Sequence, residues 1–423
     1  MSLQPARACG VDFGTSNSTV GWLRPDHSTL LTLEAGRPTL PSAVFFNADE
    51  ETVAFGRTAL AEYLDGYEGR LMRSLKSLLG SNLIDASTEV QGRSLRFRDL
   101  LKHFIGELHR RASAEAGRHF DQAVFGRPVH FVDDNEEADR LAETTLGEIA
   151  QSVGFREVSF QFEPIAAAFH YEQGLTREEL VLIVDIGGGT SDFSLVRLGP
   201  ERAKKADRRD DLLANTGVHI GGTDFDRAFS LASVMPLLGY RSLKKNGNEI
   251  PATPFFNLAT WHTINFCYTR KAWSEFQDMY RDAAERDKLD RLLNLIGQRD
   301  GHWLALQIEQ AKIGLSDADK VALSLDRITR SGEAGEQWLA REDFEAAVEP
   351  LVAQIAATVS QTLTQAGVDG EGIDTIFFTG GSSGVPLLRR RVAELLPAAR
   401  AVEGDLFGSI GAGLAVEARR RYG

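Results

Sequence analysis

Two glycine-rich segments of the same design constrain this chain more than any other feature. The first is Gly10-Val11-Asp12-Phe13-Gly14-Thr15-Ser16-Asn17-Ser18, and the second is Asp185-Ile186-Gly187-Gly188-Gly189-Thr190-Ser191-Asp192. Each follows an apolar run, places an aspartate near the end of an expected strand, turns through glycine and hydroxyl residues, and enters a second alternating stretch. The pattern predicts strand, tight turn and strand, and its repetition indicates a duplicated domain.

Both turns carry the residue types that hold phosphate groups. Glycines let backbone N–H groups approach phosphate oxygens because no Cβ stands in the way, and threonine and serine hydroxyls add further donors. An aspartate that faces the phosphates can hold Mg²⁺ through water. The two segments therefore predict two phosphate-binding hairpins that face one nucleotide.

Composition and charge limit the class of protein. The chain has 423 residues, of which 43% are hydrophobic and 25% charged, which is enough for two cores. A net charge of −13 argues against general affinity for nucleic acid or for an anionic membrane. Cys9 and Cys267 form no disulfide or metal pattern, the N-terminus lacks a signal peptide core, and no run reaches the ~20 apolar residues of a membrane helix. We therefore expect a cytoplasmic protein with no nucleic-acid or membrane partner.

Hydrophobic patterning predicts an α/β chain that divides near residue 170. The first part is expected to hold strands at 9–23, 29–33 and 42–47, a strand at 123–131 broken by Pro128, and helices at 100–116 and 136–153. The second part is expected to start with a strand at Leu180 and to be mostly helical from Asp226 to Glu309. It ends with a strand at 375–379, a Gly-Gly turn and a helix, an arrangement typical of anion or nucleoside sites.

Five segments occur in the order typical of the actin-like ATPase superfamily, and they most resemble the nucleotide-binding domain of heat-shock protein 70 (DnaK-like) chaperones. They are the two glycine-rich turns, the hinge-like Glu163-Pro164-Ile165-Ala166-Ala167-Ala168, Gly221-Gly222-Thr223-Asp224-Phe225-Asp226, and Gly380-Gly381-Ser382-Ser383-Gly384-Val385-Pro386. Arg127-Pro128 and Met235-Pro236-Leu237-Leu238-Gly239 are similar to the family's short YegD-like branch. The resemblance implies a two-lobed actin-like ATPase, a duplicated RNase H-like fold with lobes at 1–170 and 171–423 and a helical subdomain inserted in the second lobe at about 227–318.

The resemblance also implies roles for the matching residues around ATP or ADP. The implied catalytic residues are Asp12, Lys76, Glu163, Asp185 and Asp192. Among them, Asp12 and Asp185 would hold Mg²⁺ through water, and Lys76 would position the attacking water and neutralise charge on the γ-phosphate. The implied nucleotide-binding residues are Gly14, Thr15, Ser16, Asn17, Gly187, Gly188, Gly189, Thr190, Gly221, Gly222, Glu309, Lys312, Ser316, Gly380, Gly381 and Ser382. Asp405 falls at the family's second connection between the lobes.

Three departures from the family pattern bear on function. Ile313 and Gly384 stand where the family commonly has two arginines that sandwich adenine, so this cation–π stacking is missing. We expect no peptide-binding domain, because the chain stops where the family continues through an apolar linker into a β-sandwich. The region 226–309 is longer than the family's, and its aromatic residues either pack a helical core or contact a protein partner.

The function that follows is slow, Mg-dependent ATP hydrolysis in a chaperone-like switch. An alternative is a nucleotide-dependent sensor with negligible turnover, which the missing arginines favour. A small-molecule kinase of the same superfamily is disfavoured by the Gly-Gly-Thr-Asp-Phe-Asp and Glu-Pro-Ile-Ala-Ala-Ala segments, and filament formation stays open. The sequence does not predict a client, an exchange factor or an oligomeric state.

Overall fold

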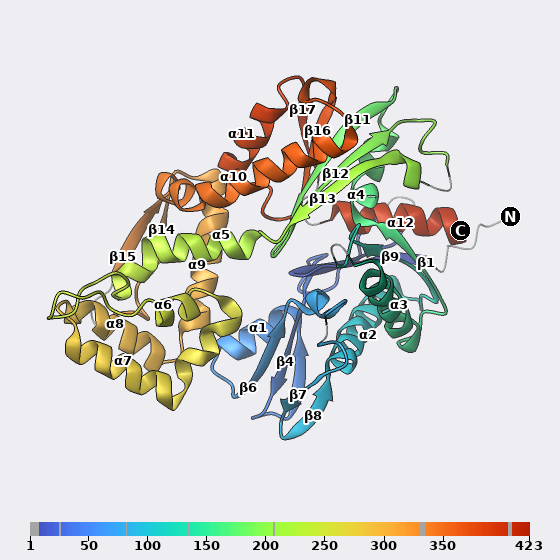
Figure 1. The fold of residues 1–423 in the computed structure, drawn as a ribbon. Coiled ribbons are helices and arrows are strands. Elements are labelled where there is room, and N and C mark those ends of the chain that lie inside the picture. The colour runs from blue at the N-terminus through green and yellow to red at the C-terminus, as the bar shows by residue number, and fades with distance from the viewer. Residues whose placement is uncertain are drawn as a thin grey trace. The chain divides into compact units, whose positions relative to one another are not determined.

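The computed structural model describes residues 8–24, 27–81, 83–132, 135–205, 208–329, 335–404 and 408–423, so Asp405 lies outside the described residues. The chain forms two compact units (Figure 1). The first unit comprises residues 1–217, 358–383 and 395–423, and the second comprises residues 218–357 and 384–394. The expected lobes at 1–170 and 171–423 remain a prediction.

The first unit contains two five-stranded sheets with the same topology. The first sheet has the order β10 (Glu157–Phe162), β9 (Gln122–Arg127), β1 (Ala8–Phe13), β2 (Asn17–Gly21) and β3 (Leu40–Pro41). The second has the order β17 (Arg400–Glu403), β16 (Thr375–Thr379), β11 (Glu179–Ile186), β12 (Ser191–Leu198) and β13 (Leu212–Val218). In each sheet an antiparallel hairpin, β1–β2 or β11–β12, is extended by two parallel strands. This repetition confirms the duplicated α/β fold.

Helices α4 (Glu163–Gln173) and α12 (Ser409–Tyr422) pack between these two sheets (Figure 1). Alternate residues of a strand face opposite sides of its sheet, and Ala8 of β1 and Val124 of β9 face the helices. Glycines allow the close packing, because a Cβ at Gly10 would clash with the backbone of α12 and one at Gly413 would clash with the backbone of Ala166 in α4. One apolar cluster therefore joins both sheets through the two helices.

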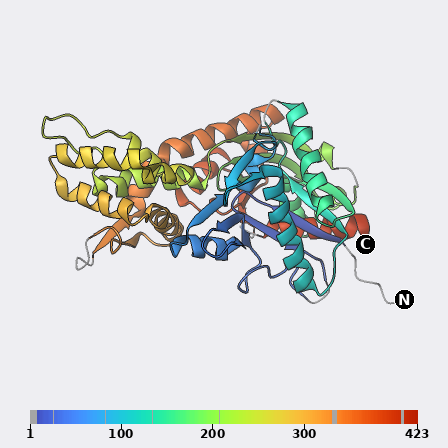
Figure 2. The same ribbon diagram turned by 90° about the horizontal axis from the view of Figure 1, so that it is seen from below.

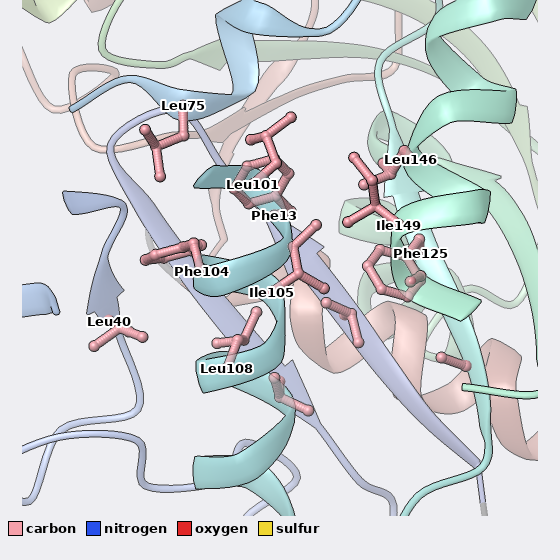
Figure 3. Close-up of a cluster of buried hydrophobic side chains, with 14 of the residues drawn as sticks. Phe13, Leu40, Leu75, Leu101, Phe104, Ile105, Leu108, Phe125, Leu146 and Ile149 are labelled. Atoms are coloured by element: carbon pink, nitrogen blue, oxygen red, sulfur yellow. The ribbon is translucent and has the colours of Figure 1, made fainter. Parts of the chain in front are cut away.

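The other face of the first sheet is covered by α2 (Phe97–Ala116) and α3 (Glu136–Ser152), which lie side by side (Figure 2). Phe13 and Phe125 extend from β1 and β9 into a cluster with Phe104 of α2 and Ile149 of α3 (Figure 3). Leu75, the first residue of the 3-10 helix η1 (Leu75–Leu78), is buried in the same cluster. The core thereby anchors the short helix that carries Lys76.

A smaller sheet and a hairpin complete this part of the first unit. The sheet has the order β5 (Thr52–Phe55), β4 (Ala43–Asn47) and β6 (Gly69–Arg73) with α1 (Gly56–Leu64) against it, and the hairpin is β7 (Ser87–Val90) and β8 (Arg93–Arg96). The strand expected at 29–33 was wrong, since its pairing with the end of β2 is limited to the bridge of Leu30 with Gly21 and the two backbone hydrogen bonds beside it. Leu31 and Leu33 are buried in the core without a continuous ladder, so the alternating pattern reflects core packing and not a strand.

The second unit is mostly helical, as expected for Asp226 to Glu309. Its elements are α5 (Gly222–Phe229), α6 (Thr253–Leu258), η5 (Trp261–Tyr268), α7 (Arg270–Asp282), α8 (Arg286–Gly297), α9 (Gly301–Asp317), β14 (Lys320–Ser324), β15 (Glu336–Ala340), most of α10 (Arg341–Ala366) and most of α11 (Pro386–Leu395). Phe255 and Phe276 are buried core residues, whereas Phe256, Phe266 and Trp273 are exposed. Among the helices of the described ranges, none is both long and apolar enough to cross a membrane.

Candidate functional site

The first glycine-rich turn joins β1 to β2. It is held by Ser42, which lies between β3 and β4. A Cβ at Gly14 would clash with the carbonyl group of Asn17, so the turn closes only with glycine there. Ser42 donates its hydroxyl hydrogen to the Gly14 carbonyl oxygen over 2.7 Å, and its N–H donates to the Ser16 carbonyl oxygen over 2.9 Å. Ser42 is 1% exposed, so its side of these bonds is shielded from water. This role of Ser42 was not predicted from its local sequence.

The second turn joins β11 to β12 and lies against the first. The Gly187 N–H donates to the Thr190 carbonyl oxygen over 2.9 Å and closes the turn. A Cβ at Gly188 would clash with the hydroxyl oxygen of Ser16, whereas a Cβ at Gly189 would meet no atom within 4 Å. The structure thus brings the two predicted phosphate turns together.

Two aspartates stand at equivalent places in the two hairpins. In the strand pairing Asp12 lies opposite Thr19, and Asp185 lies opposite Asp192. The pKa of Asp12 is raised to about 7, first by burial and then by the charge of Glu163, while the charge of Lys76 opposes the shift. The pKa of Asp185 is raised to about 8, first by burial and then by the charges of Asp192, Glu163 and Asp12, while the charge of Lys76 opposes the shift. These carboxyl groups therefore influence one another directly.

Lys76 places a positive charge among these carboxyl groups. Its Nζ donates to Glu163 Oε1 over 2.6 Å, and both side chains are nearly buried. Burial lowers the pKa of Lys76, but the charges of Glu163, Asp12 and Asp192 outweigh burial and raise the pKa overall. The ammonium group therefore stays charged. All five implied catalytic residues share one electrostatic environment, with four carboxyl groups and one ammonium group.

The turn after β16 adds backbone groups beside Asp185. Gly380 has φ +80°, which favours glycine, and a Cβ there would clash with the Asp185 carboxylate and the Ile186 carbonyl group. The Ser382 N–H donates to the Ile186 carbonyl oxygen over 3.0 Å. The expected site residues Gly380, Gly381 and Ser382 thus lie next to the second phosphate turn.

The remaining expected nucleotide-binding residues belong to the second unit. Gly221 donates its N–H to Asp224 Oδ2 over 3.0 Å at the start of α5. Lys312 of α9 is buried and donates to the Gly222 carbonyl oxygen over 3.1 Å and to Asp226 Oδ2 over 3.0 Å. Lys312 therefore holds the N-terminus of α5, a role that its motif did not indicate. Glu309 and Ser316 lie on the same helix and are partly exposed.

The carboxyl groups around Lys76 have the chemistry to hold an Mg²⁺ ion through water. In the part of the chain that the structure describes, no three His, Cys, Asp or Glu side chains are placed to bind a metal directly. Buried carboxyl groups with raised pKa values are stabilised in their ionised form by a nearby divalent cation. Asp12 and Asp185 both have pKa values raised by burial.

Comparison with known proteins identifies the family. The model of the family described as Hsp70 protein matches residues 8–233 and 296–419. The chain belongs to the Hsp70 family. Residues 234–295 of this Hsp70 chain lie outside the matched ranges. They contain η4 (Met235–Leu238) and most of α8. The expectation that the region 226–309 is longer than the family's remains a prediction.

Chaperone proteins named DnaK are among its relatives. The DnaK of Thermosipho melanesiensis is 28% identical over 403 residues, which are 93% of this chain and 56% of that protein. The DnaK of Deinococcus radiodurans is 26% identical over 416 residues, 92% of this chain and 56% of that protein, and the DnaK of Thermus thermophilus is 26% identical with shares of 92% and 57%. The chain spans about half the length of the curated relatives it matches.

Proposed function

We propose that this Hsp70-family protein binds Mg-ATP, hydrolyses it slowly and serves as a chaperone-like conformational switch. The observation that carries the proposal is the cluster of carboxyl groups around Lys76. It lies beside the two glycine-rich turns, which meet at Gly188 and Ser16. Backbone N–H groups and hydroxyls in two adjacent turns suit a chain of phosphates. The DnaK relatives, which are chaperones by name, support the same direction.

The chemistry follows from positioning and charge. Phosphoryl transfer needs little covalent help from the protein, because most catalysis comes from orientation and from neutralising charge on the phosphate oxygens. In the proposed reaction Lys76 orients the attacking water and neutralises charge on the γ-phosphate, and its bond to Glu163 keeps it protonated and in place. Asp12 and Asp185 would hold Mg²⁺ through water, which would supply further neutralising charge at the phosphates. Asp192 would orient water or the ion.

The nucleotide is held by the two turns and by the nucleoside residues. For the phosphates we propose Gly14, Thr15, Ser16, Asn17, Gly187, Gly188, Gly189 and Thr190. For the nucleoside we propose Gly221, Gly222, Glu309, Lys312, Ser316, Gly380, Gly381 and Ser382. With Ile313 and Gly384 in place of stacking arginines, affinity for adenine falls, by about 0.5–2 kcal/mol for each lost arginine.

A sensor with negligible turnover is the second candidate, and one observation favours it. Ile313 is 48% exposed on α9 and offers no charge to a nucleotide base. A protein with weakened base binding and intact phosphate turns would report nucleotide state through binding alone. The two candidates differ in turnover and not in the residues that bind phosphate.

We further propose a cytoplasmic protein with a protein partner on residues 234–295 and with no nucleic-acid or membrane partner. Phe266 of η5 and Trp273 of α7 are 61% and 37% exposed within this segment. Exposed aromatic side chains are common at protein interfaces. The segment's position outside the matched ranges of the family suits a contact particular to this protein.

The test is calorimetric titration of ATP with Mg²⁺ into the protein, followed by phosphate release on the same samples. Asp185→Asn is the variant, and Asp99→Asn on the exposed side of α2 is the control. Micromolar binding with slow turnover that Asp185→Asn abolishes supports the switch. Binding without turnover supports the sensor, and absence of ATP binding by the parent protein refutes both.

A further inference from the structure

Arg127, the last residue of β9, is bonded on every nitrogen of its guanidinium group. Its Nε donates to the Pro128 carbonyl oxygen over 2.9 Å, and its Nη2 donates to the Val129 carbonyl oxygen over 2.9 Å and to Asp139 Oδ2 over 2.7 Å. Its Nη1 forms an ion pair with Glu143 of α3. The side chain is only 13% exposed. Arg127 therefore fastens the backbone at 128–129 to helix α3.

Two aromatic rings enclose the same guanidinium group. The rings of Phe131 and Phe162 each lie 5.3 Å from its central carbon. Phe131 is itself fixed, because its N–H donates to Asp139 Oδ1 over 2.5 Å. Phe162 lies opposite Arg127 in the pairing of β9 with β10, and it directly precedes Glu163 at the start of α4. A planar guanidinium group can stack on rings and bond in its own plane at once, which a lysine ammonium group cannot do.

Residues on both sides of Arg127 contact the segments that carry the Lys76–Glu163 pair. A Cβ at Gly126 would lie 3.1 Å from Glu163 Cγ and 3.4 Å from Oε1, the oxygen that accepts from Lys76. Gly80, four residues after Lys76, has φ +76°, and a Cβ there would clash with the side chain of Val132. The strand end before Arg127 thus packs on Glu163, and the loop after it packs behind the turn that follows Lys76.

We propose that Arg127 is a positioning residue that holds Glu163 and Lys76 in register for the proposed hydrolysis. It ties together the end of β9, the residue before Glu163 and the loop behind η1, and it acts on the reaction only through the Lys76–Glu163 pair. Its described contacts lie on α3, on β10 and on the loop after β9, which carry none of the residues proposed to bind phosphate. Loss of Arg127 therefore lowers turnover more than nucleotide binding.

The consequence for hydrolysis rests on the proposed function, but the positioning itself can be measured without nucleotide. We compare the rate at which N-hydroxysuccinimidyl acetate acetylates Lys76, read by mass spectrometry relative to Lys102, an exposed lysine of α2. The variants are Arg127→Met and Arg127→Lys, with Glu163→Gln as the reference for a broken pair. Arg98→Met is the matched control, because Arg98 also pairs with α3, through a 2.8 Å bond to Glu148 at the surface.

We expect Arg127→Met to acetylate Lys76 several-fold faster, close to the rate in Glu163→Gln, while Arg127→Lys lies between and Arg98→Met matches the parent. A folded Arg127→Met with the parent's rate of acetylation overturns the proposal. If circular dichroism shows that Arg127→Met does not fold, Phe162→Leu, which removes one stacked ring, decides in the same assay: faster acetylation supports the proposal, and the parent's rate overturns it.

Kinetics provide the second readout. In a parent protein that hydrolyses ATP, Arg127→Met should lower kcat about tenfold, since small misplacements of catalytic groups are costly, and should leave KM within about twofold. An unchanged kcat in a folded Arg127→Met overturns the effect on catalysis. A parent protein without turnover refutes the proposed hydrolysis, and the acetylation rates then still decide whether Arg127 positions Lys76.

Discussion

Gly188 faces Ser16 so closely that the two glycine-rich turns touch at this point, where a Cβ on Gly188 would clash with the Ser16 hydroxyl oxygen. The two residues lie far apart in the sequence and come from equivalent turns of the two sheets. The contact makes each turn sensitive to substitution in the other.

Gly188→Ala should therefore weaken ATP binding through Ser16. The new methyl group forces the Ser16 hydroxyl to rotate away, so that one phosphate donor is lost at little cost to stability. We expect about tenfold weaker ATP binding, close to the value of one hydrogen bond to a charged group. Calorimetry on Gly188→Ala, on Ser16→Ala and on the double variant measures the effect.

The double variant should bind ATP no more weakly than either single variant, since both remove the same donor. Gly106→Ala on α2 is the control, because a Cβ there meets only Val153 at 3.5 Å. Fully additive losses in the double variant would show that Gly188 acts independently of Ser16.

Asp185→Asn should stabilise the nucleotide-free protein at alkaline pH. The pKa of Asp185 rises from 3.8 to about 8 on folding, so the folded protein binds more protons than the unfolded chain between these values. The contribution of Asp185 to stability is therefore fully present below pH ~4 and is lost as the pH rises toward 8. Asparagine carries no charge at either extreme, so the variant avoids this loss.

Thermal unfolding followed by circular dichroism at pH 5 and pH 8 tests this prediction without nucleotide or metal. We expect Asp185→Asn to raise Tm relative to the parent by a few degrees more at pH 8 than at pH 5. Asp99→Asn should follow the parent at both pH values. A Tm difference between Asp185→Asn and the parent that does not change with pH would contradict the raised pKa.

The motifs predicted the two hairpins, both aspartates and the duplicated sheets because local sequence determines each of these features. A glycine turn between alternating runs requires only neighbouring residues, and Asp12 and Asp185 follow from their places in such turns. The alternation at 29–33 failed as a strand signal because Leu31 and Leu33 face the core while the segment pairs with the end of β2 at the single bridge of Leu30 with Gly21.

Contacts between residues far apart in the chain could not be predicted from the sequence. Ser42 reaches back to Gly14, and Lys312 reaches Asp226 across 86 residues of chain. Nothing near Ser42 or Lys312 in the sequence specifies these partners, because the partners are set by how strands and helices pack. The pairing of Arg127 with Phe162 is of the same kind, since it depends on the register of β9 and β10.

Ser42→Ala should loosen the first phosphate turn. The variant loses the partly buried 2.7 Å hydrogen bond to the Gly14 carbonyl oxygen and the buried 3.0 Å contact with the Ser18 hydroxyl oxygen. A buried acceptor left without its donor costs about 1–3 kcal/mol. We expect a lower free energy of unfolding by denaturant and ATP binding that is several-fold weaker by calorimetry.

Ser152→Ala is the control for Ser42→Ala, since it removes a 2.7 Å bond from a serine hydroxyl to the Ile149 carbonyl oxygen within α3. It should leave ATP binding unchanged. If Ser42→Ala loses stability but binds ATP like the parent, the Ser42 hydroxyl supports the fold and is not needed to shape the phosphate turn.

Ile313→Arg should strengthen ATP binding if Ile313 lies beside the base as proposed. Ile313 is 48% exposed, so the substitution costs little stability, and the preceding residue, Lys312, is already fixed by Asp226 and Gly222. A guanidinium group stacked on adenine contributes about 0.5–2 kcal/mol, which corresponds to about twofold to thirtyfold tighter binding.

Ile313→Lys adds the same charge without a planar group, and its ATP affinity should rise less than that of Ile313→Arg. Titration with tripolyphosphate separates stacking from charge, because stacking improves binding of ATP alone, whereas a purely electrostatic gain improves both ligands equally. Unchanged ATP affinity in Ile313→Arg would place the base elsewhere and contradict the proposed nucleoside contact of α9.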